Sequence, residues 1–78
     1  MDVSHPVVKA IERHLASHPH AADSAEGVAR WWLDALAPLP RQDEVTQALT
    51  LLVNLGRLRC RSLSDGTLLF SSEAGFTQ

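Results

Sequence analysis

The stretch that decides the fold runs from Gln42 to Phe70 and reads QDEVTQALTLLVNLGRLRCRSLSDGTLLF. In its first half, apolar residues recur at three- and four-residue spacing, which is typical of one face of an α-helix. The spacing predicts a helix over 42–55 whose apolar stripe is Val45, Ala48, Leu49, Leu52 and Leu55. Gly56 follows, where a left-handed C-terminal cap is expected.

Beyond Gly56 the apolar and polar residues alternate with a period of two, which indicates β-strands. Residues 57–61 predict one strand, and residues 67–70 predict the return strand of a hairpin near 57–70. Asp65 and Gly66 lie between the strands and are typical turn residues. The sequence therefore predicts a terminal β-hairpin directly after the helix.

The length of the hairpin loop decides which side chains share a face of the sheet. A two-residue loop would place Leu68 and Phe70 on the same face as the arginines of the first strand. A three-residue loop over 64–66 pairs Cys60 with Phe70 and collects the apolar side chains on one face: Leu58, Cys60, Leu68 and Phe70. We therefore expect the three-residue loop, built as a type I turn with Gly66 in the left-handed conformation.

A first helix is expected over 6–17. Pro6 suits a first helical position, where its missing N–H costs nothing. The apolar stripe of this helix is Val7, Val8, Ile11 and Leu15. The helix is expected to end at His18–Pro19, because a residue before proline is pushed out of helical geometry.

A second helix is expected over 24–36, before the linker of residues 37–40. Asp23 is its expected cap, and Glu26 completes a pattern that resembles a capping box. Its apolar stripe is Ala25, Val28, Ala29, Trp32 and Leu36. A third short strand could join the hairpin, from Ala21–Ala22 or from the linker 38–41. The expected fold class is α+β and mostly helical, with three helices followed by a β-hairpin.

Length and composition predict one small folded domain over 1–78. We expect an ordered core at about 5–71 and a frayed end at 72–78. Hydrophobic residues make up 45% of the chain, which is far above the share in disordered proteins. The single cysteine rules out an internal disulfide, and neither a signal peptide nor a membrane span is visible. We therefore expect a cytoplasmic protein without membrane contact. Its net charge is −2, whereas compact nucleic-acid binders usually have a basic excess.

The order of three helices with a hairpin directly after the last one resembles the winged helix-turn-helix superfamily. The residues that carry the resemblance are QDEVTQALTLLVNLG and RLRCRSLSDGTLLF, within 23–71. In DNA-binding members, the helix before the hairpin lies in the major groove. The resemblance implies that Gln47 and Asn54 would face the bases and that Arg41 would precede the helix.

The charges around this helix differ from those of a typical groove-binding helix. Asp43 and Glu44 lie at its start, and its outer face carries no Lys or Arg. Because phosphate neutralisation supplies most of the affinity in such complexes, this face disfavours groove insertion. The row Arg57, Arg59 and Arg61 could bind phosphates or an acidic protein surface. Alternatively, it protects an edge strand from aggregation.

No motif of the chain indicates a catalytic site or a metal site. His14 and His18 have a spacing that can present two imidazoles to a metal, but no cysteine accompanies them, and we expect no metal site. Cys60 lies between two arginines, which could lower its pKa, but on the apolar hairpin face we expect an inert core thiol. The sequence contains no nucleophile elbow and no phosphate-binding glycine run. We therefore expect neither enzymatic activity nor a cofactor.

The Trp31–Trp32 pair is the most informative local feature. Adjacent helical residues point about 100° apart, so we expect Trp32 in the core and Trp31 at its edge or outside. Exposed tryptophan is typical of interfaces, although the first helix or Phe76 could cover it. We favour a module that binds a protein partner or self-associates, with an interface of Trp31, Asp43, Glu44 and Gln47. The alternative is a DNA-binding transcriptional regulator that uses Arg41, Gln47, Asn54, Arg57, Arg59 and Arg61.

Overall fold

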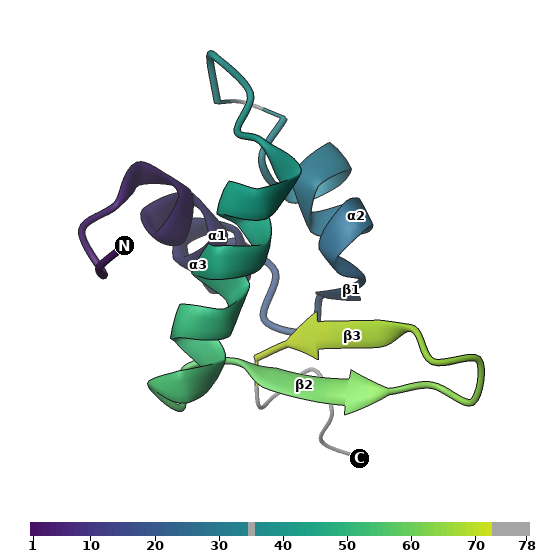
Figure 1. The fold of residues 1–78 in the computed structure, drawn as a ribbon. Coiled ribbons are helices and arrows are strands. Elements are labelled where there is room, and N and C mark those ends of the chain that lie inside the picture. The colour runs from purple at the N-terminus through teal and green to yellow at the C-terminus, as the bar shows by residue number, and fades with distance from the viewer. Residues whose placement is uncertain (35, 73–78) are drawn as a thin grey trace.

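The computed structural model describes residues 1–34 and 36–72. In chain order its elements are α1 (Pro6–Ser17), β1 (Ala22–Asp23), α2 (Ala25–Gly27), η1 (Val28–Trp32), α3 (Gln42–Asn54), β2 (Arg59–Ser62) and β3 (Leu68–Ser71) (Figure 1). α2 continues directly into η1, a π-helical segment, so the two form one helical run. The predicted α+β, mostly helical class is confirmed. The frayed end is expected at 72–78, and residues 73–78 lie outside the described part of the chain.

The helices pack around α3, and an antiparallel sheet with strand order β1–β3–β2 lies against one end of this layer (Figure 1). The core forms between them from these buried side chains: Val7, Val8, Ile11, Leu15, Val28, Trp32, Leu33, Val45, Ala48, Leu49, Leu52, Leu58 and Phe70. Of the two expected sources for a third strand, the structure uses the first, because β1 pairs with β3 through Ala22 and Ser71. In the described part of the chain, no helix is long and apolar enough to cross a membrane.

α1 has the predicted bounds. The Nδ1 of His5 accepts a hydrogen bond from the N–H of Val7 at 3.2 Å, and Pro6 occupies the first helical position. At the other end, His18 leaves helical geometry with φ −133° and ψ 72°. A proline follows His18, which is the expected reason for the end of the helix.

The second helix is shorter than the predicted 24–36, because the helical run ends at Trp32. Its cap is Ser24 rather than Asp23: the Ser24 hydroxyl accepts from the N–H of Gly27 at 3.1 Å. Asp23 belongs to β1, and its carboxylate accepts from the N–H of Ser24 at 2.8 Å. Gly27 leaves room for that carboxylate, because a Cβ at this position would collide with it. Sheet pairing has therefore moved the start of the helix by one residue.

The end of this helix follows from the packing of Leu33. Leu33 adopts φ −115° and ψ 14°, and its side chain is buried in the core. A turn follows, in which the N–H of Leu36 donates to the carbonyl of Leu33 at 3.1 Å. Leu36 packs against the core from this turn as a half-buried side chain. Its predicted contact with the core is therefore made without a helix.

α3 lies where the sequence predicts it. The carboxylate of Glu44 accepts from the N–H of Arg41 at 3.0 Å and caps the start of the helix. At the end, Gly56 has φ 75°, which confirms the predicted left-handed cap. The prediction that Leu55 belongs to the buried stripe is wrong, because its side chain is 50% exposed. The helix ends at Asn54, and the chain turns toward the sheet before Leu55 could pack.

The hairpin has the predicted register. Cys60 pairs with Phe70 and Ser62 with Leu68, while the N–H of Leu63 donates to the carbonyl of Thr67 at 2.8 Å. Gly66 has φ 91°, as the three-residue loop requires.

The predicted buried face of the hairpin is only half correct. Leu58 and Phe70 are buried, but Leu68 is 47% exposed, and Cys60 is exposed rather than an inert core thiol. The physical reason is that β2 is an edge strand and that the hairpin tip projects beyond the helices (Figure 1). Only the end of this face that lies near the helices is covered.

Gly66→Val is expected to lower the free energy of unfolding by about 1–2 kcal/mol, because a β-branched side chain is strained at positive φ. No atom of the described residues lies within 4 Å of a Cβ built at this position, so the loss would come from the backbone conformation alone. Urea unfolding of the parent and the variant measures it. An unchanged unfolding midpoint would contradict this account of the turn.

Candidate functional site

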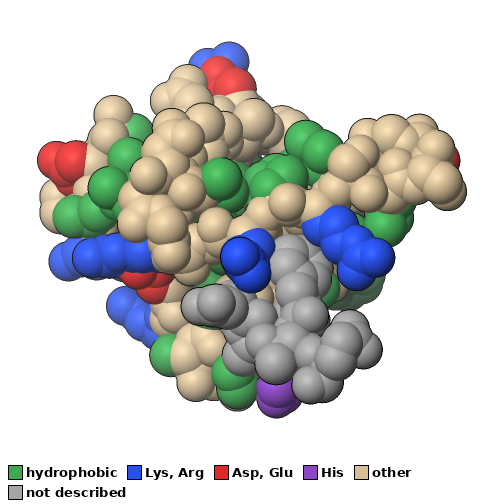
Figure 2. Space-filling view, turned by 90° about the horizontal axis from the view of Figure 1, so that it is seen from below, with side chains coloured by type: hydrophobic (Ala, Val, Ile, Leu, Met, Phe, Trp, Pro, Cys, Tyr) green, Lys and Arg blue, Asp and Glu red, His purple; other side chains and the backbone are tan. Residues whose placement is uncertain are grey.

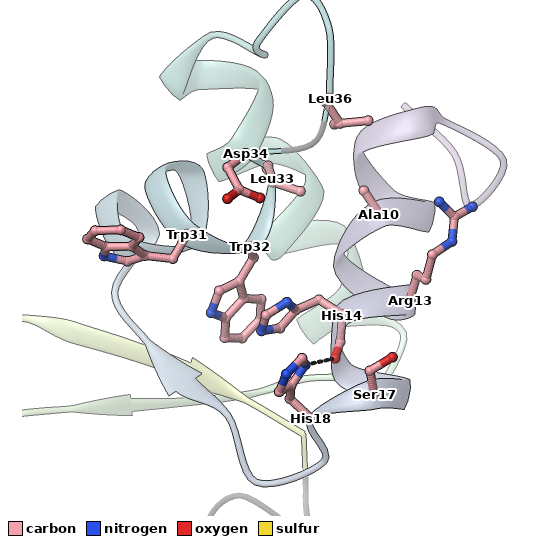
Figure 3. Close-up of a pocket in the computed structure, with 10 residues that line it drawn as sticks. All are labelled: Ala10, Arg13, His14, Ser17, His18, Trp31, Trp32, Leu33, Asp34 and Leu36. Carbon is pink, nitrogen blue, oxygen red and sulfur yellow. Dashed lines mark hydrogen bonds between the residues drawn. The ribbon is translucent and has the colours of Figure 1, made fainter.

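Three aromatic rings from two helices stack in a column at the edge of the core (Figure 3). The indole of Trp32 in η1 lies against the imidazole of His14 in α1, with ring centroids 4.7 Å apart and planes 13° apart. His14 lies in turn against His18, with centroids 4.5 Å apart and planes 18° apart. Trp32 is buried, which confirms its predicted place in the core. The column joins η1 to the last turn of α1.

The end of α1 positions the two histidines. His14 and His18 are four residues apart, which places their side chains on the same face, one turn after the other. The backbone N–H of His18 donates to the carbonyl of His14 at 2.8 Å, and the Nδ1 of His18 lies 3.3 Å from the same oxygen. These contacts hold the His18 ring against His14.

An open hollow of about 300 Å³ lies beside the column, between α1 and the end of η1 (Figure 3). It is lined by Ala10, Arg13, His14, Ser17, His18, Trp31, Trp32, Leu33, Asp34 and Leu36. Trp31 forms part of its wall, and 63% of this residue is exposed. The possibility that the first helix covers Trp31 is therefore wrong, and Phe76 lies outside the described residues. We call this region the Trp31 hollow.

Burial at the Trp31 hollow lowers the pKa of His14 below its ordinary value of 6.5. Repulsion from a protonated His18 lowers it further, whereas the carboxylate of Asp34 opposes the shift. His14 is therefore harder to protonate in the folded chain than in the unfolded chain. The column is accordingly most stable when His14 is neutral.

The folded protein is expected to lose stability as the pH falls below about 6.5, because the unfolded chain then binds a proton that folded His14 resists. The contribution is fully present above the unfolded pKa and is lost as the pH falls toward the lower folded value. Urea unfolding across this pH range should show a smaller loss for His14→Gln than for the parent. His20→Gln, outside the column, is the control. Equal pH dependence of the parent and His14→Gln would contradict the assignment.

The four residues predicted as a protein interface belong to two elements, η1 and α3. Trp31 lines the hollow between α1 and η1, whereas Asp43, Glu44 and Gln47 belong to α3 and do not line it. Asp43 and Gln47 are exposed on α3, and Glu44 is half-buried with its carboxylate engaged at Arg41. Of the four residues, Trp31 alone lines the hollow, and their assignment to one interface stays a prediction.

The candidate nucleic-acid contacts lie on α3, at its start, and in or just before β2. The side chain of Arg41 pairs with Asp43 at 3.4 Å, and that of Arg57 pairs with Glu12 of α1 at 2.9 Å. Arg57 precedes β2, so the predicted row of three arginines on one strand is reduced to Arg59 and Arg61. Both are exposed on the edge strand, and Figure 2 shows basic side chains along this side of the molecule.

The remaining polar candidates lie on the outer face of α3. Gln47 and Asn54 are exposed there, and they line a shallow depression together with Thr46, Thr50, Leu51 and Met1. This face is uncharged apart from the acidic residues at its start. It therefore offers hydrogen-bonding groups but no cation for a phosphate.

Sequence reasoning considered His14 and His18 only as metal ligands and missed the stacking of His18 on His14 and of His14 on Trp32. Within residues 1–34 and 36–72, no group of three or more His, Cys, Asp or Glu side chains could hold a metal ion. Sequence reasoning also did not identify Asp34 as a residue that lines the hollow. The four-residue spacing of the histidines and the adjacent tryptophans were the available signals. Comparison with protein-family models, curated proteins and solved structures finds no match to this chain.

Proposed function

We propose that this chain is a non-enzymatic binding module of winged-helix type that binds a protein partner through the Trp31 hollow. The observation that carries the proposal is the 63% exposure of Trp31 beside the buried Trp32. A large aromatic side chain that closes against a partner buries much apolar area and can dominate a protein interface. The hollow beside it offers a concave surface for that contact.

The order of elements supports the winged-helix part of the proposal. α3 is followed after four residues by the hairpin of β2 and β3, which is the expected position of a wing. β1 lies between the first two helices and pairs with β3 as the third strand of the sheet. The hairpin tip projects from the helical layer as a wing would (Figure 1).

The charge distribution supports a protein partner over DNA. Asp43 is exposed at the start of α3, where a groove-binding helix would meet phosphates, and Arg41 beside it is already paired with this carboxylate. The outer face of α3 supplies no further cation. Phosphate neutralisation would thus depend on the hairpin alone.

The test compares Trp31→Ala with Leu39→Ala, which removes another exposed apolar side chain outside the hollow. Both variants are expected to keep the parent's thermal unfolding midpoint nearly unchanged, since exposed positions contribute little to stability. Trp31→Ala alone should lose self-association in sedimentation or the partner that the immobilised parent captures. If Trp31→Ala keeps both, or if Leu39→Ala loses the same contacts, the proposal is wrong.

A DNA-binding regulator is the second candidate, and the exposed Arg59 and Arg61 on β2 favour it. In this case the parent protein is expected to bind duplex DNA through the hairpin and to give a weak mobility shift at low salt. Replacing both arginines with Ala should then flatten the slope of affinity against salt by up to about two phosphate contacts. Arg57→Ala is the control, because Arg57 lies outside β2 and pairs with Glu12 of α1. Tight binding that survives the double replacement would exclude binding through the hairpin.

A further inference from the structure

We infer that the Trp31 hollow accepts a basic side chain, Lys or Arg, from its protein partner. The inference rests on the proposed function and adds the chemistry of the group that enters the hollow. Trp31, Trp32 and Asp34 all belong to the lining of the hollow, and aromatic and acidic residues together complement an extended cation with an apolar stem.

The two tryptophans and Asp34 come from one short stretch of chain, at the end of η1 and just after it. Figure 3 shows the Asp34 carboxylate above Trp32, on the side of the hollow away from His18, and the Trp31 indole at the outer edge, directed away from Trp32 and α1. Trp31 and Asp34 are both exposed, so an incoming side chain can reach them. Trp32 forms the inner wall and is held in place by its stacking on His14.

The carboxylate of Asp34 is available for a new partner. Among the described residues, ion pairs within 4 Å join Arg41 to Asp43 and Arg57 to Glu12, and none includes Asp34. A cation placed beside it would therefore gain an ion pair without displacing one.

The basic residues that line the hollow do not fill this position. Arg13 lines the hollow, but Figure 3 shows its side chain on the far side of α1, directed away from the tryptophans. His14 lies flat against Trp32, and burial lowers its pKa, so that it is mostly neutral above pH 7. His18 stacks on the face of His14 opposite Trp32.

This chemistry selects a basic side chain over the others. A Lys or Arg head gains cation–π attraction at an indole face, for which Trp is the best ring, and its methylene stem packs on the same surface. It also gains the Coulomb attraction of Asp34. A neutral side chain keeps only the apolar contact, and an acidic side chain is repelled by Asp34.

The experiment titrates the isotope-labelled chain with four short blocked peptides of the form Gly-X-Gly, where X is Arg, Lys, citrulline or Glu. Nuclear magnetic resonance follows the two indole N–H signals, one for each tryptophan. We expect the Arg and Lys peptides to move the Trp31 signal saturably. Citrulline, the uncharged analogue of Arg, should bind several-fold more weakly, and the Glu peptide should not bind.

Three variants locate the binding, with the affinity read from backbone amide signals around the hollow. Trp31→Leu keeps the apolar bulk and removes the π face, which should weaken Arg-peptide binding about two- to fivefold. Asp34→Asn should weaken it by a similar factor at low salt. Asp43→Asn removes an exposed carboxylate of α3 and should leave the affinity unchanged.

The outcomes separate this inference from the proposed function. Equal binding of the citrulline and Arg peptides, preferred binding of the Glu peptide, or no movement of the Trp31 signal with any peptide would overturn the inference. Arg-peptide affinity that Trp31→Leu and Asp34→Asn leave unchanged would also overturn it. The proposed function instead depends on whether Trp31→Ala loses self-association or partner capture. If a partner binds in a Trp31-dependent manner but the hollow shows no preference for basic peptides, the proposed function stands. Only the inference that a basic side chain enters the hollow is then rejected.

Discussion

Trp32→Ala is expected to lower the free energy of unfolding by about 3–5 kcal/mol, the usual range for truncating a core tryptophan. Trp32 is 7% exposed and belongs to the core cluster. Its truncation would also remove the ring that supports His14 in the column. Since the single core of a domain of 78 residues rarely supplies more than about 3–5 kcal/mol, this single change is expected to leave a large fraction of the protein unfolded. Thermal melts followed by circular dichroism measure the loss.

Trp31→Ala is the matched control for this prediction, because it removes the same side chain from the adjacent position. Its expected cost is below about 1 kcal/mol, as for other surface substitutions without a specific structural role. The two variants together test the separation of a core tryptophan from a surface tryptophan. Equal and severe destabilisation by both would mean that Trp31 also belongs to the core and that the Trp31 hollow is not a binding surface.

Leu52→Ala is expected to lower the free energy of unfolding by about 2–5 kcal/mol. Leu52 is fully buried, and α3 packs there against the other elements of the core. Its backbone carbonyl also accepts from the N–H groups of Arg57 and Leu58, at 2.9 and 3.2 Å, where the chain turns toward the sheet. A cavity at this position would therefore loosen the junction of helix and hairpin. Urea unfolding gives the loss of free energy.

Leu55→Ala provides the comparison, since Leu55 continues the same helical spacing but is half exposed. It is expected to cost less than about 1 kcal/mol, because its truncation opens no cavity. A cost at Leu55 close to that at Leu52 would contradict the position of the helix end at Asn54. The pair thus distinguishes the apolar stripe of the sequence from the core of the structure.

Local sequence patterns were sufficient to predict most of the helices and strands. Proline at the start of α1 and glycine after α3 predict the ends of these helices, because both residues restrict or permit backbone conformations without help from distant contacts. The hairpin register followed from requiring Cys60 and Phe70 to share a face, and the structure confirms this pairing. The bounds of the second helix could not be predicted in the same way. They depend on the pairing of β1 with β3 and on the burial of Leu33, which are both long-range effects.

The sequence by itself determined the fold class, the three helical segments, the hairpin with its left-handed Gly66, and the different places of Trp31 and Trp32. These features depend on the period of apolar residues and on backbone preferences, which act between residues close in the chain. Only the tertiary structure decided that His14 stacks on Trp32, that Asp34 lines the hollow beside Trp31, and that Cys60 is exposed. The reason is geometric. α1 and η1 meet at an angle and a distance that the whole core sets, and a strand face is covered only where a helix reaches it.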